Sequence, residues 1–359
     1  MNELYLLVGA ALLLAAVVDI LWTALWIDGG AGPLSAPLMS GTWAGIRRLS
    51  GDHPRALSLS GPVITALSLS LWIGLLWLGW TVLFAAGDPG LIDTRNAEPV
   101  TWSGRFYYVA YSMFTMGNGD FAPAGEPWQI ATAFTTATGM LIATMSVTYL
   151  LTVLGAVSEK RSFASGVTGL GKRGEALVRS GWDERRGDFH DLDLPLNPLG
   201  DQLDALAEQH LSYPILHYYH SEGIDDASPV AVAVLEEAVT ILRFGVPEAH
   251  RPNEALLESL HASVASYART LDAAFIEPAD RAPPPPDLDR LREAGVPTVR
   301  GDEFGDAAAD RREVRRKLLA GVRNDEREWP GEGPESRDDD TDTGTDRREE
   351  AATADRKHP

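Results

Sequence analysis

Apolar residues are concentrated in the first 157 positions of the chain, where they form three long runs. The runs cover residues 4–27, 57–86 and 128–157, and a single charged residue, Asp19, interrupts them. A helix rises 1.5 Å per residue, so about 20 apolar residues cross the hydrocarbon core of a bilayer. The pattern therefore predicts an all-α membrane protein with three transmembrane helices. The first run lacks the basic residues that open a signal peptide, so we expect it to be retained.

Basic residues in the short loops predict the orientation of these helices. Loop 28–56 and the segment just after the third run are rich in arginine and lysine, whereas loop 87–127 has an excess of acidic residues. Positively charged loops stay on the cytoplasmic side of a membrane. We therefore expect loop 28–56 and everything after residue 158 in the cytoplasm, with the N-terminus and loop 87–127 outside the cell. The basic residues concerned are Arg47, Arg48, Arg55, Lys160, Arg161, Lys172 and Arg173.

Residues 105–116 (RFYYVAYSMFTM) form an apolar segment that is too short to cross a bilayer. A segment of this length between full spans is typical of a re-entrant helix. It runs into the sequence Thr115-Met116-Gly117-Asn118-Gly119-Asp120. Non-helical backbone at membrane depth is tolerated only where it is buried in protein or lines a cavity. Alternating glycines allow such a strand to point successive carbonyl oxygens to one side, where four copies would replace the water shell of a cation.

This segment resembles the pore loop of the potassium channel family, whose filter reads T-V-G-Y-G-D followed by two residues and a proline. Residues 57–157 carry the resemblance, in the order pore helix, filter, proline and inner helix. Tyr107 and Tyr108 stand where family members carry an aromatic pair in the pore helix, and Gly139 stands at the hinge position of the inner helix. The matching filter residues are Thr115, Gly117, Gly119, Asp120 and Pro123. The resemblance implies a two-transmembrane-type pore with one extra N-terminal helix.

The resemblance also implies roles for individual residues. The Thr115 hydroxyl and the filter carbonyls would coordinate the ion, Asp120 would lie at the outer mouth, and the tyrosine pair would support the filter. The implied filter residues are Thr115, Met116, Gly117, Asn118 and Gly119. Because one chain supplies one pore loop, a closed pore requires about four chains, most simply a cyclic homotetramer in the lipid bilayer. K⁺ is the expected permeant ion, and no resident metal or cofactor is expected.

Two filter positions depart from the family pattern. Met116 replaces the usual valine or isoleucine, and Asn118 replaces the usual tyrosine. In the family that tyrosine packs behind the filter, whereas the Asn118 amide can face either the ion path or the pore helix. Selectivity depends on the number and field strength of the carbonyl sites. Potassium conduction is the first hypothesis, and nonselective K⁺ and Na⁺ permeation or a non-conducting channel-like receptor are the alternatives.

Three features within the spans leave alternatives open. Asp19 is either a functional intramembrane acid or, as we expect, a helix contact. Gly139 is either a hinge or a site of close helix packing. The hydroxyl groups of the third span either face a water-filled cavity or bond to carbonyls one turn back. They belong to Thr135, Thr136, Thr138, Thr144, Ser146 and Thr148.

Composition excludes several other functions for the 359-residue chain. Its net charge of −20 opposes nucleic acid binding, and the absence of cysteine excludes disulfides, thiolate metal sites and thiol catalysis. The sequence contains no HExxH, G-x-S-x-G or complete P-loop, so we do not expect an enzyme. Gly169-x-Gly171-x-x-Gly174 matches the dinucleotide fingerprint, but the polar residues before it do not form the strand that the fingerprint requires.

The remaining half of the chain is more polar. Apolar residues recur at helical spacing within 199–277, and the last part of the chain is rich in charged residues. Three predicted helices within 199–277 indicate a cytoplasmic helical domain whose ligand or partner, if it has one, is unknown. His210, His217 and His220 cluster there, and we expect them to be packed or at the surface rather than to bind a metal. A charged helix is predicted over 302–322, and disorder from about residue 324. The predicted domains are 1–56 (N-terminal helix and loop), 57–157 (pore), 158–198 (juxtamembrane linker), 199–277 (helical domain) and 278–359 (proline-rich linker, charged helix and disordered acidic tail).

Overall fold

The computed structural model describes residues 1–26, 30–50, 54–96, 98–273 and 276–331. These residues are mostly helical, with one two-stranded sheet, which confirms the predicted all-α class. They form two compact units. Unit 1 comprises residues 1–157 and 209–220, and unit 2 comprises residues 158–208 and those from 221 onward.

Three helices among the described residues are long and apolar enough to cross a membrane, and they lie in unit 1 except for residues 158–170 of the third. α1 (Glu3–Leu25) and α4 (Ser60–Ala85) correspond to the first and second predicted spans, while α6 (Glu126–Leu170) extends well beyond the third. Shorter elements connect them: α2 (Ser35–Ser50), α3 (Pro54–Ser58), β1 (Leu91–Asp93), α5 (Trp102–Met113) and β2 (Phe121–Pro123). The apolar pattern does not predict α2, because this helix is not a long hydrophobic run.

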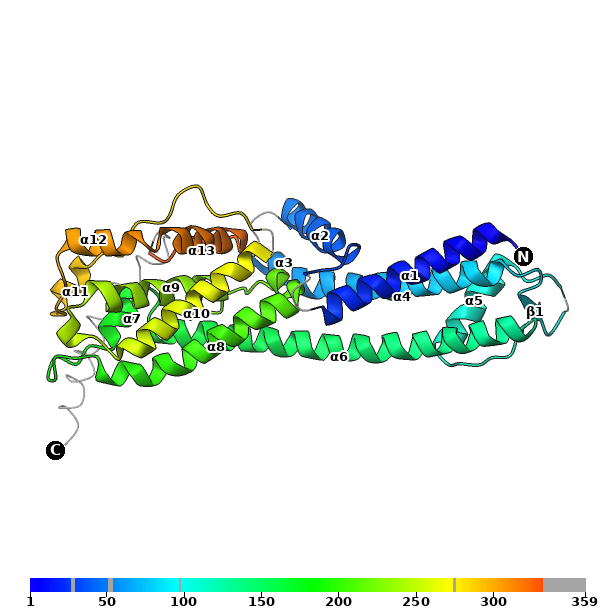
Figure 1. The fold of residues 1–359 in the computed structure, drawn as a ribbon, viewed down its shortest axis with the longest axis horizontal. Helices are drawn as coiled ribbons and strands as arrows, with labels where there is room; N and C mark the ends of the chain where they lie inside the picture. Colours follow the sequence, from blue (N-terminus) through cyan, green and yellow to red (C-terminus); the bar gives the residue numbers. More distant parts are fainter. Residues whose placement is uncertain (27–29, 51–53, 97, 274–275, 332–359) are drawn as a thin grey trace, which may run out of the picture. The chain divides into compact units, whose positions relative to one another are not determined.

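α1 and α4 lie side by side (Figure 1). Two glycines permit their close approach. A methyl group on Gly9 would lie 2.8 Å from the backbone nitrogen of Leu83, and one on Gly79 would lie 2.9 Å from the side chain of Leu13. Small residues at a helix crossing let two backbones pack tightly, which is how helices associate where lipid removes the hydrophobic driving force. α1 and α4 therefore form a closely packed helix pair in unit 1.

Asp19 links α1 to the start of α2. Its carboxyl group is fully buried and accepts hydrogen bonds from the backbone N–H groups of Leu34 and Ser35 at 2.7 and 3.1 Å. It also accepts hydrogen bonds from the Ser35 hydroxyl and, at 2.9 Å, from the indole of Trp72. The first N–H groups of a helix have no partner within it, so a buried helix start needs such an acceptor. Asp19 is therefore a helix contact, the alternative that the sequence favours.

Residues 209–220 belong to unit 1 although they are distant in sequence from its helices. The ring of Tyr219 lies against Gly61, where a methyl group would come within 2.5 Å of the ring, and its hydroxyl is 2.8 Å from that of Thr65. The segment thus packs on the first turns of α4. The buried residues of this cluster are Met39, Trp43, Leu57, Ile64, Tyr149, Val153, Ala156, Ile215, Leu216 and Tyr219.

Unit 2 is a helical assembly around α9 (Ser228–Thr240). This helix is apolar on nearly every side, and all of its residues except Pro229 are buried, as expected of a central helix. α7, α10 and α13 pack against it. The other helices are α7 (Gly174–Ser180), α8 (Asp193–Ser212, of which 209–212 belong to unit 1), α10 (Glu254–Ala273), α11 (Asp289–Glu293), α12 (Gly301–Ala309) and α13 (Arg312–Asn324).

The segment 158–198, predicted as a juxtamembrane linker, contains helices whose apolar residues are buried. α6 continues to Leu170, and α7 follows after a short turn. Phe163, Val167 and Leu177 are buried in the core of unit 2. They share this core with residues of α9, which lie between 228 − 177 = 51 and 240 − 163 = 77 positions further along the sequence, so the local pattern does not reveal their burial.

The glycine pattern at 169–174 lies at the junction of α6 and α7. A helix precedes it, and the strand that a dinucleotide site requires is not present among these described residues. A methyl group on Gly174 would lie 2.4 Å from the Cβ atom of Glu237, and one on Gly171 would lie 2.4 Å from the backbone nitrogen of Leu177. Both glycines therefore permit close packing around α7.

The folded part of the chain also extends beyond residue 324. Trp329 is buried, and its indole donates a hydrogen bond of 2.7 Å to the carboxyl group of Glu237. The predicted disorder is therefore wrong for residues 324–331, because one tryptophan in a polar segment supplies a buried anchor. The rest of the predicted acidic tail, 332–359, lies outside the described residues. The predicted charged helix over 302–322 is divided into α12 and α13.

Candidate ion-conduction site

α5 is a short helix that leads directly into the predicted filter. Its first turn is capped by the Thr101 hydroxyl, which accepts a hydrogen bond of 3.2 Å from the backbone N–H of Gly104. The ring of Phe106 stacks on Trp77 of α4 at 4.2 Å, and the Trp77 indole donates a 2.9 Å hydrogen bond to the Phe106 carbonyl. The helix ends at Met113, so the filter begins where its last turn stops.

The filter backbone alternates between two kinds of conformation. Thr115, Gly117 and Gly119 have φ angles of +57°, +60° and +76°, while Met116 and Asn118 between them lie outside the positive-φ region. Such an alternation turns every second peptide, so that successive carbonyl groups face one side of the strand. Glycine adopts a positive φ without strain, but for threonine the conformation costs roughly 1–3 kcal/mol. Strain of this kind is characteristic of functional sites.

Hydrogen bonds with α5 and with a neighbouring loop hold the two ends of the predicted filter, residues 115–119. The backbone N–H of Met116 donates to the Tyr111 carbonyl at 2.8 Å, and that of Thr115 donates to the Ser112 carbonyl at 3.2 Å. At the other end the Thr94 hydroxyl donates to the carbonyl of Gly119 at 2.8 Å. The Gly119 carbonyl therefore accepts a hydrogen bond from a side chain of the same chain.

Asn118 points away from the strand toward the pore helix. Its side-chain amide donates a hydrogen bond to the hydroxyl of Tyr107. Of the two orientations that the sequence leaves open, this structure has the one behind the filter. The hydrogen bond between Asn118 and Tyr107 connects this strand to α5. A larger aromatic residue at position 118 would contact the same helix through its ring.

Three tyrosines of α5 contact three different neighbours. Tyr107 bonds to Asn118, while the buried Tyr108 bonds to the Thr132 hydroxyl on α6. Tyr111 was not among the predicted site residues, yet its hydroxyl donates a 2.8 Å hydrogen bond to the carbonyl of Phe121, just beyond the filter. Its position four residues after Tyr107, on the same face of the helix, is the signal that could have identified it.

Asp120 pairs with Arg95 at the end of the filter. The two side chains form an ion pair, in which the Asp120 side chain is largely buried and Arg95 is exposed. β1 and β2 pair antiparallel nearby, with Leu91 opposite Pro123, and bring Arg95 to this position. The backbone N–H groups of Arg95 and Asn96 donate to the carboxylate of Asp93 and lower its pKa. The ion pair with Arg95 thus places a positive charge of the same chain beside the carboxylate of Asp120.

Gly139 is where α6 passes the end of the pore helix. A methyl group on Gly139 would lie 2.2 Å from the carbonyl oxygen of Met113, closer than any real contact. Because the obstacle is backbone, no side-chain rotation could relieve it. Close packing is thus observed at this position, and the hinge role stays a prediction.

Several hydroxyl groups of α6 bond within the helix. Those of Thr135, Thr138 and Thr144 donate to carbonyls four residues earlier, at 2.8, 2.9 and 3.0 Å. The Thr138 hydroxyl also accepts a 3.0 Å hydrogen bond from the indole of Trp80 on α4. For these three residues the structure shows the bonding inside the helix that the sequence leaves as one of two alternatives.

The predicted histidine cluster packs on aromatic rings. His210 and His217 have ring centroids 4.7 Å apart, and His220 stacks on Trp43 at 4.4 Å with nearly parallel planes. Among the described residues, no group of three or more His, Asp or Glu side chains is placed to hold a metal ion.

Comparisons with known proteins agree with this geometry. Residues 70–156 match a protein family described as "Ion channel", and this segment contains α5, the filter and the first part of α6. The chain is 42% identical over 330 residues to YdjJ of Bacillus subtilis (strain 168), which is described as an uncharacterized membrane protein; the match covers 92% of this chain and 96% of YdjJ. No solved structure matches the chain. The chain therefore belongs to the family of YdjJ, and it carries a segment that matches the family described as "Ion channel".

Proposed function

We propose that this protein is a homotetrameric ion channel that conducts K⁺ passively across the cell membrane through a filter of backbone carbonyls. The observation that carries the proposal is the alternation of positive φ at Thr115, Gly117 and Gly119 directly after a short helix. Carbonyl groups that face one side of a strand can replace the hydration shell of a cation only if several strands surround it.

Tetramerisation is supported by the surface that the single chain leaves open. Phe114 and the filter residues 115–119 are exposed in one chain, and Met116 is 63% exposed. A membrane-depth loop must be covered by protein or line a cavity. Large apolar residues on α6 are also exposed: Ile130, Phe134, Met140, Leu141, Val147 and Leu151. Cyclic assembly of four chains would cover part of this surface and place four filters around one axis.

Potassium selectivity is supported by the way in which the filter is held. The Asn118 amide donates a hydrogen bond to Tyr107, and the Gly119 carbonyl accepts one from Thr94. These two hydrogen bonds limit how far the strand can move away from the ion path. The carbonyls proposed to coordinate K⁺ are those of Thr115, Met116, Gly117 and Asn118, together with the Thr115 hydroxyl. Nonselective permeation of K⁺ and Na⁺ is the second candidate, because one asparagine makes a smaller brace than the tyrosine it replaces.

The orientation is also part of the proposal. Positive residues at 47, 48 and 55, and after the third span, would keep loop 28–56 and unit 2 in the cytoplasm. The N-terminus and the β1–β2 hairpin would then face outside, and Asp120 with Arg95 would lie at the outer mouth. Cysteine introduced at exposed positions and labelled with a membrane-impermeant reagent in intact cells tests this arrangement.

Reversal potentials test conduction and selectivity together. Purified full-length protein is placed in planar bilayers with K⁺ on one side and Na⁺ on the other. A reversal potential far from zero, of the sign that opposes K⁺ flow, supports the proposal, and one near zero supports nonselective permeation. Absence of current under all conditions, with a folded tetramer present, would favour a non-conducting receptor.

The variant Asn118→Tyr isolates the filter brace. It restores the residue usual in potassium channels and is expected to raise the permeability of K⁺ relative to Na⁺. An unchanged permeability ratio would show that Asn118 has no part in selectivity. The matched control is Asn96→Tyr, which places the same side chain on the exposed loop before the pore helix.

A further inference from the structure

The loop between α4 and α5 pairs with the segment that follows the predicted filter. β1 and β2 run antiparallel, with Asp93 opposite Phe121. The backbone N–H of Thr94 donates a 3.1 Å hydrogen bond to the Asp120 carbonyl, which extends this pairing to the end of the filter. The hairpin therefore lies directly beside the filter end, although the two segments are far apart in the sequence.

The side chains of the hairpin strengthen this attachment. The Thr94 hydroxyl is within hydrogen-bond distance of the carbonyls of Gly119 at 2.8 Å and Asp120 at 2.9 Å. The carboxylate of Asp93 accepts a 2.8 Å hydrogen bond from the backbone N–H of Arg95. A bond from an aspartate to the backbone two residues later fixes a turn. Arg95 therefore leaves the hairpin at a defined place beside the filter end.

At this place Arg95 forms an ion pair with Asp120. The Asp120 side chain is 17% exposed and that of Arg95 is 65% exposed, so the acid is largely covered and the arginine is open to solvent. An ion pair with an exposed partner contributes little to stability. Its larger effect is on the electrostatic potential around it, which depends on the net charge of the two groups.

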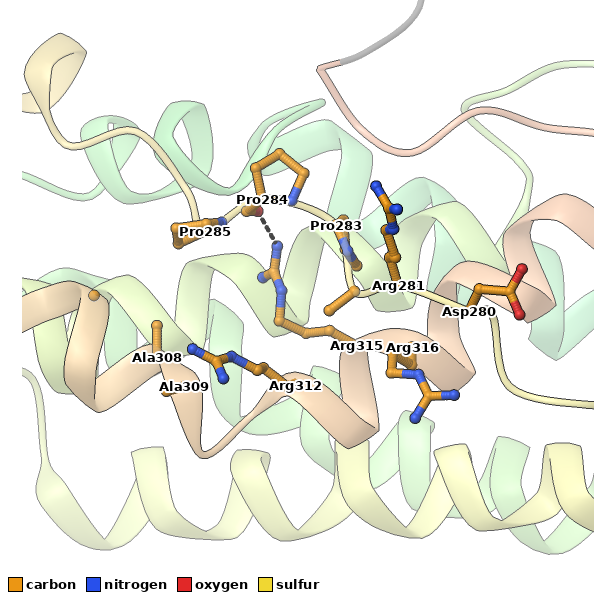
Figure 2. Close-up of a pocket in the computed structure, with 12 residues that line it drawn as sticks. Asp280, Arg281, Pro283, Pro284, Pro285, Ala308, Ala309, Arg312, Arg315 and Arg316 are labelled. Atoms are coloured by element: carbon orange, nitrogen blue, oxygen red, sulfur yellow. Dashed lines mark hydrogen bonds between the residues drawn. The ribbon is translucent and has the colours of Figure 1, made fainter.

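A buried arginine of unit 2 shows the contrast. The Arg315 side chain is 3% exposed and binds Glu236 at 2.7 Å and Glu237 at 3.2 Å. Figure 2 shows its further hydrogen bond, of 2.7 Å, to the Pro284 carbonyl. Removing such a residue leaves buried acids without a partner and destabilises the fold. Arg95 can be replaced without opening a core, so the effect of its charge is separable from folding.

Arg95 belongs to a loop with an excess of acidic residues. Loop 87–127 contains five acidic and two basic residues. The second basic residue, Arg105, lies in the first turns of α5, with its guanidinium 5.7 Å from the centre of the Trp102 ring. Without Arg95 the charge of Asp120 would therefore be uncompensated in a loop that is already negative.

In the proposed tetramer four copies of Asp120 and Arg95 surround the ion path, so the following inference rests on the proposed function. An uncompensated negative charge raises the local concentration of cations. A potential that concentrates monovalent cations by a given factor concentrates divalent cations by the square of that factor. Carboxylates are also preferred ligands of Ca²⁺. A mouth with four uncompensated acids would therefore gather divalent cations in preference to K⁺.

We propose that Arg95 is a specificity-determining residue of the channel, which keeps divalent cations away from the outer mouth by compensating the charge of Asp120. Thr94 is a positioning residue, because its bonds to the Gly119 and Asp120 carbonyls keep the acid beside the arginine. The pair leaves the mouth open to monovalent cations and protects it from block by divalent ones.

A cysteine at position 95 tests the role of the charge within one folded channel. The chain has no cysteine of its own, so Arg95→Cys can be modified selectively. The K⁺ current of the full-length variant is recorded in planar bilayers with Ca²⁺ on the outer side, before and after a thiosulfonate reagent that adds a positive or a negative charge. Half-block is expected at a Ca²⁺ concentration about tenfold or more below that of the unaltered chain. The positive reagent should restore the original value, and the negative reagent should lower it further.

Arg95→Lys is the matched control, because it keeps the charge. Its half-blocking Ca²⁺ concentration should equal that of the unaltered chain. The difference between Arg95→Cys and the unaltered chain should shrink as K⁺ is raised from about 20 mM to about 1 M, because salt screens surface charge. At low salt the K⁺ conductance of Arg95→Cys should rise as well, by a smaller factor, because K⁺ carries one charge.

Thr94→Val removes the hydroxyl and keeps the shape of the side chain. If Thr94 positions the pair, this variant should be blocked by less Ca²⁺ than the unaltered chain, with a smaller change than in Arg95→Cys. Thr94→Ser keeps the hydroxyl and should match the unaltered chain. Equal block in Thr94→Val and Thr94→Ser would show that the hydroxyl does not position the pair.

The role of Arg95 is overturned if both reagents leave the Ca²⁺ block unchanged while mass spectrometry shows the label in place. It is also overturned if the difference in block persists at high salt, since that result would indicate a change of structure rather than of surface charge. Normal K⁺ currents with unaltered block would contradict this inference alone. Absence of current in the unaltered chain would overturn the proposed function and this inference with it.

Discussion

The side-chain amide of Asn118 donates a hydrogen bond to the hydroxyl of Tyr107, so the filter is tied to the helix behind it by a polar contact within one chain. In the proposed channel this bond limits how far the strand can widen. It joins the two residues whose identities most affect the proposed selectivity.

Tyr107→Phe removes the hydroxyl and keeps the ring. We expect the ratio of K⁺ to Na⁺ permeability to fall, because the Asn118 amide loses its anchor and the strand becomes free to widen. The ratio is measured from bi-ionic reversal potentials. Tyr5→Phe, which removes a hydroxyl on the first turn of α1, is the control and should leave the ratio unaltered; an equal effect of both variants would argue against a local brace.

Gly139→Ala tests whether the close approach of α6 to Met113 is required. The added methyl group would meet the Met113 carbonyl at 2.2 Å, so either α6 or the end of the pore helix must move. We expect a loss of roughly 1–3 kcal/mol in stability, typical of overpacking, together with reduced conduction. Thermal unfolding in detergent and single-channel current measure the two effects.

Gly155→Ala is the control for that substitution. It lies on the same helix, and a methyl group there meets nothing within 4 Å in the chain. Alanine favours a helix over glycine by about 1 kcal/mol, so this variant should be neutral or slightly stabilised. If Gly139→Ala keeps full stability and changes only the time spent open, Gly139 acts as a hinge and the packing explanation is wrong.

The features that the sequence predicts well are those determined by short stretches of chain. The apolar runs predict the spans because bilayer thickness sets their length, and the sequence from 105 to 123 indicates a pore helix and filter because each part is local. Partners were not predictable in this way. Nothing near Arg95 or Tyr111 in the sequence shows that one pairs with Asp120 and the other with Phe121, since the β1–β2 hairpin and the fold of α5 bring them together.

The same dependence on distant partners explains why the sequence does not reveal several buried residues in the second half of the chain. Phe163 and Trp329 each look like isolated apolar residues in polar surroundings, and Leu177 belongs to a run of only three, yet all are buried in the core of unit 2. Their burial depends on α9, a helix whose apolar surface extends nearly all round and therefore needs covering on every side. α2 is a further case, because the acceptor for its first N–H groups, Asp19, belongs to another helix.

Asp19→Asn is expected to destabilise the junction of α1 and α2. An amide has one acceptor oxygen, whereas the Asp19 carboxyl group accepts bonds at both oxygens from Leu34, Ser35 and Trp72. We expect a loss of about 2–3 kcal/mol, the range for leaving buried polar groups without partners. Thermal unfolding measures it. Ser35→Ala, which removes one donor, should cost about 1 kcal/mol, and a larger loss in Ser35→Ala than in Asp19→Asn would contradict the central role of the acid.

The contact of Tyr219 with Gly61 can be tested by exchange of size. Gly61→Ala would place a methyl group 2.5 Å from the Tyr219 ring and should destabilise unit 1 by roughly 1–3 kcal/mol. In the double variant with Tyr219→Ala the methyl group enters vacated space, so the effect of Gly61→Ala should become close to zero. Additive losses in the double-mutant cycle would show that the two residues do not interact.

Glu237 gives unit 2 a pH-dependent stability. Burial raises the pKa of this carboxyl group to about 7, although Arg315 and the Trp329 indole act in the opposite direction. A folded-state pKa above the unfolded value means that the folded state binds the proton more tightly. The stability from this group is therefore fully present below about pH 4.5 and is lost as pH rises through about 7, by about 3 kcal/mol in all.

Glu237→Gln removes the titration while keeping an oxygen that can accept from Trp329 and Arg315. The difference in unfolding temperature between pH 5 and pH 8 should therefore be smaller in this variant than in the unaltered chain, because the other titrating groups remain. Glu258→Gln alters an exposed acid on α10 and should leave the difference as it was. If Glu237→Gln keeps the full pH dependence, the group that titrates is elsewhere, and the buried network of Glu237 with Arg315 stays ionised throughout this range.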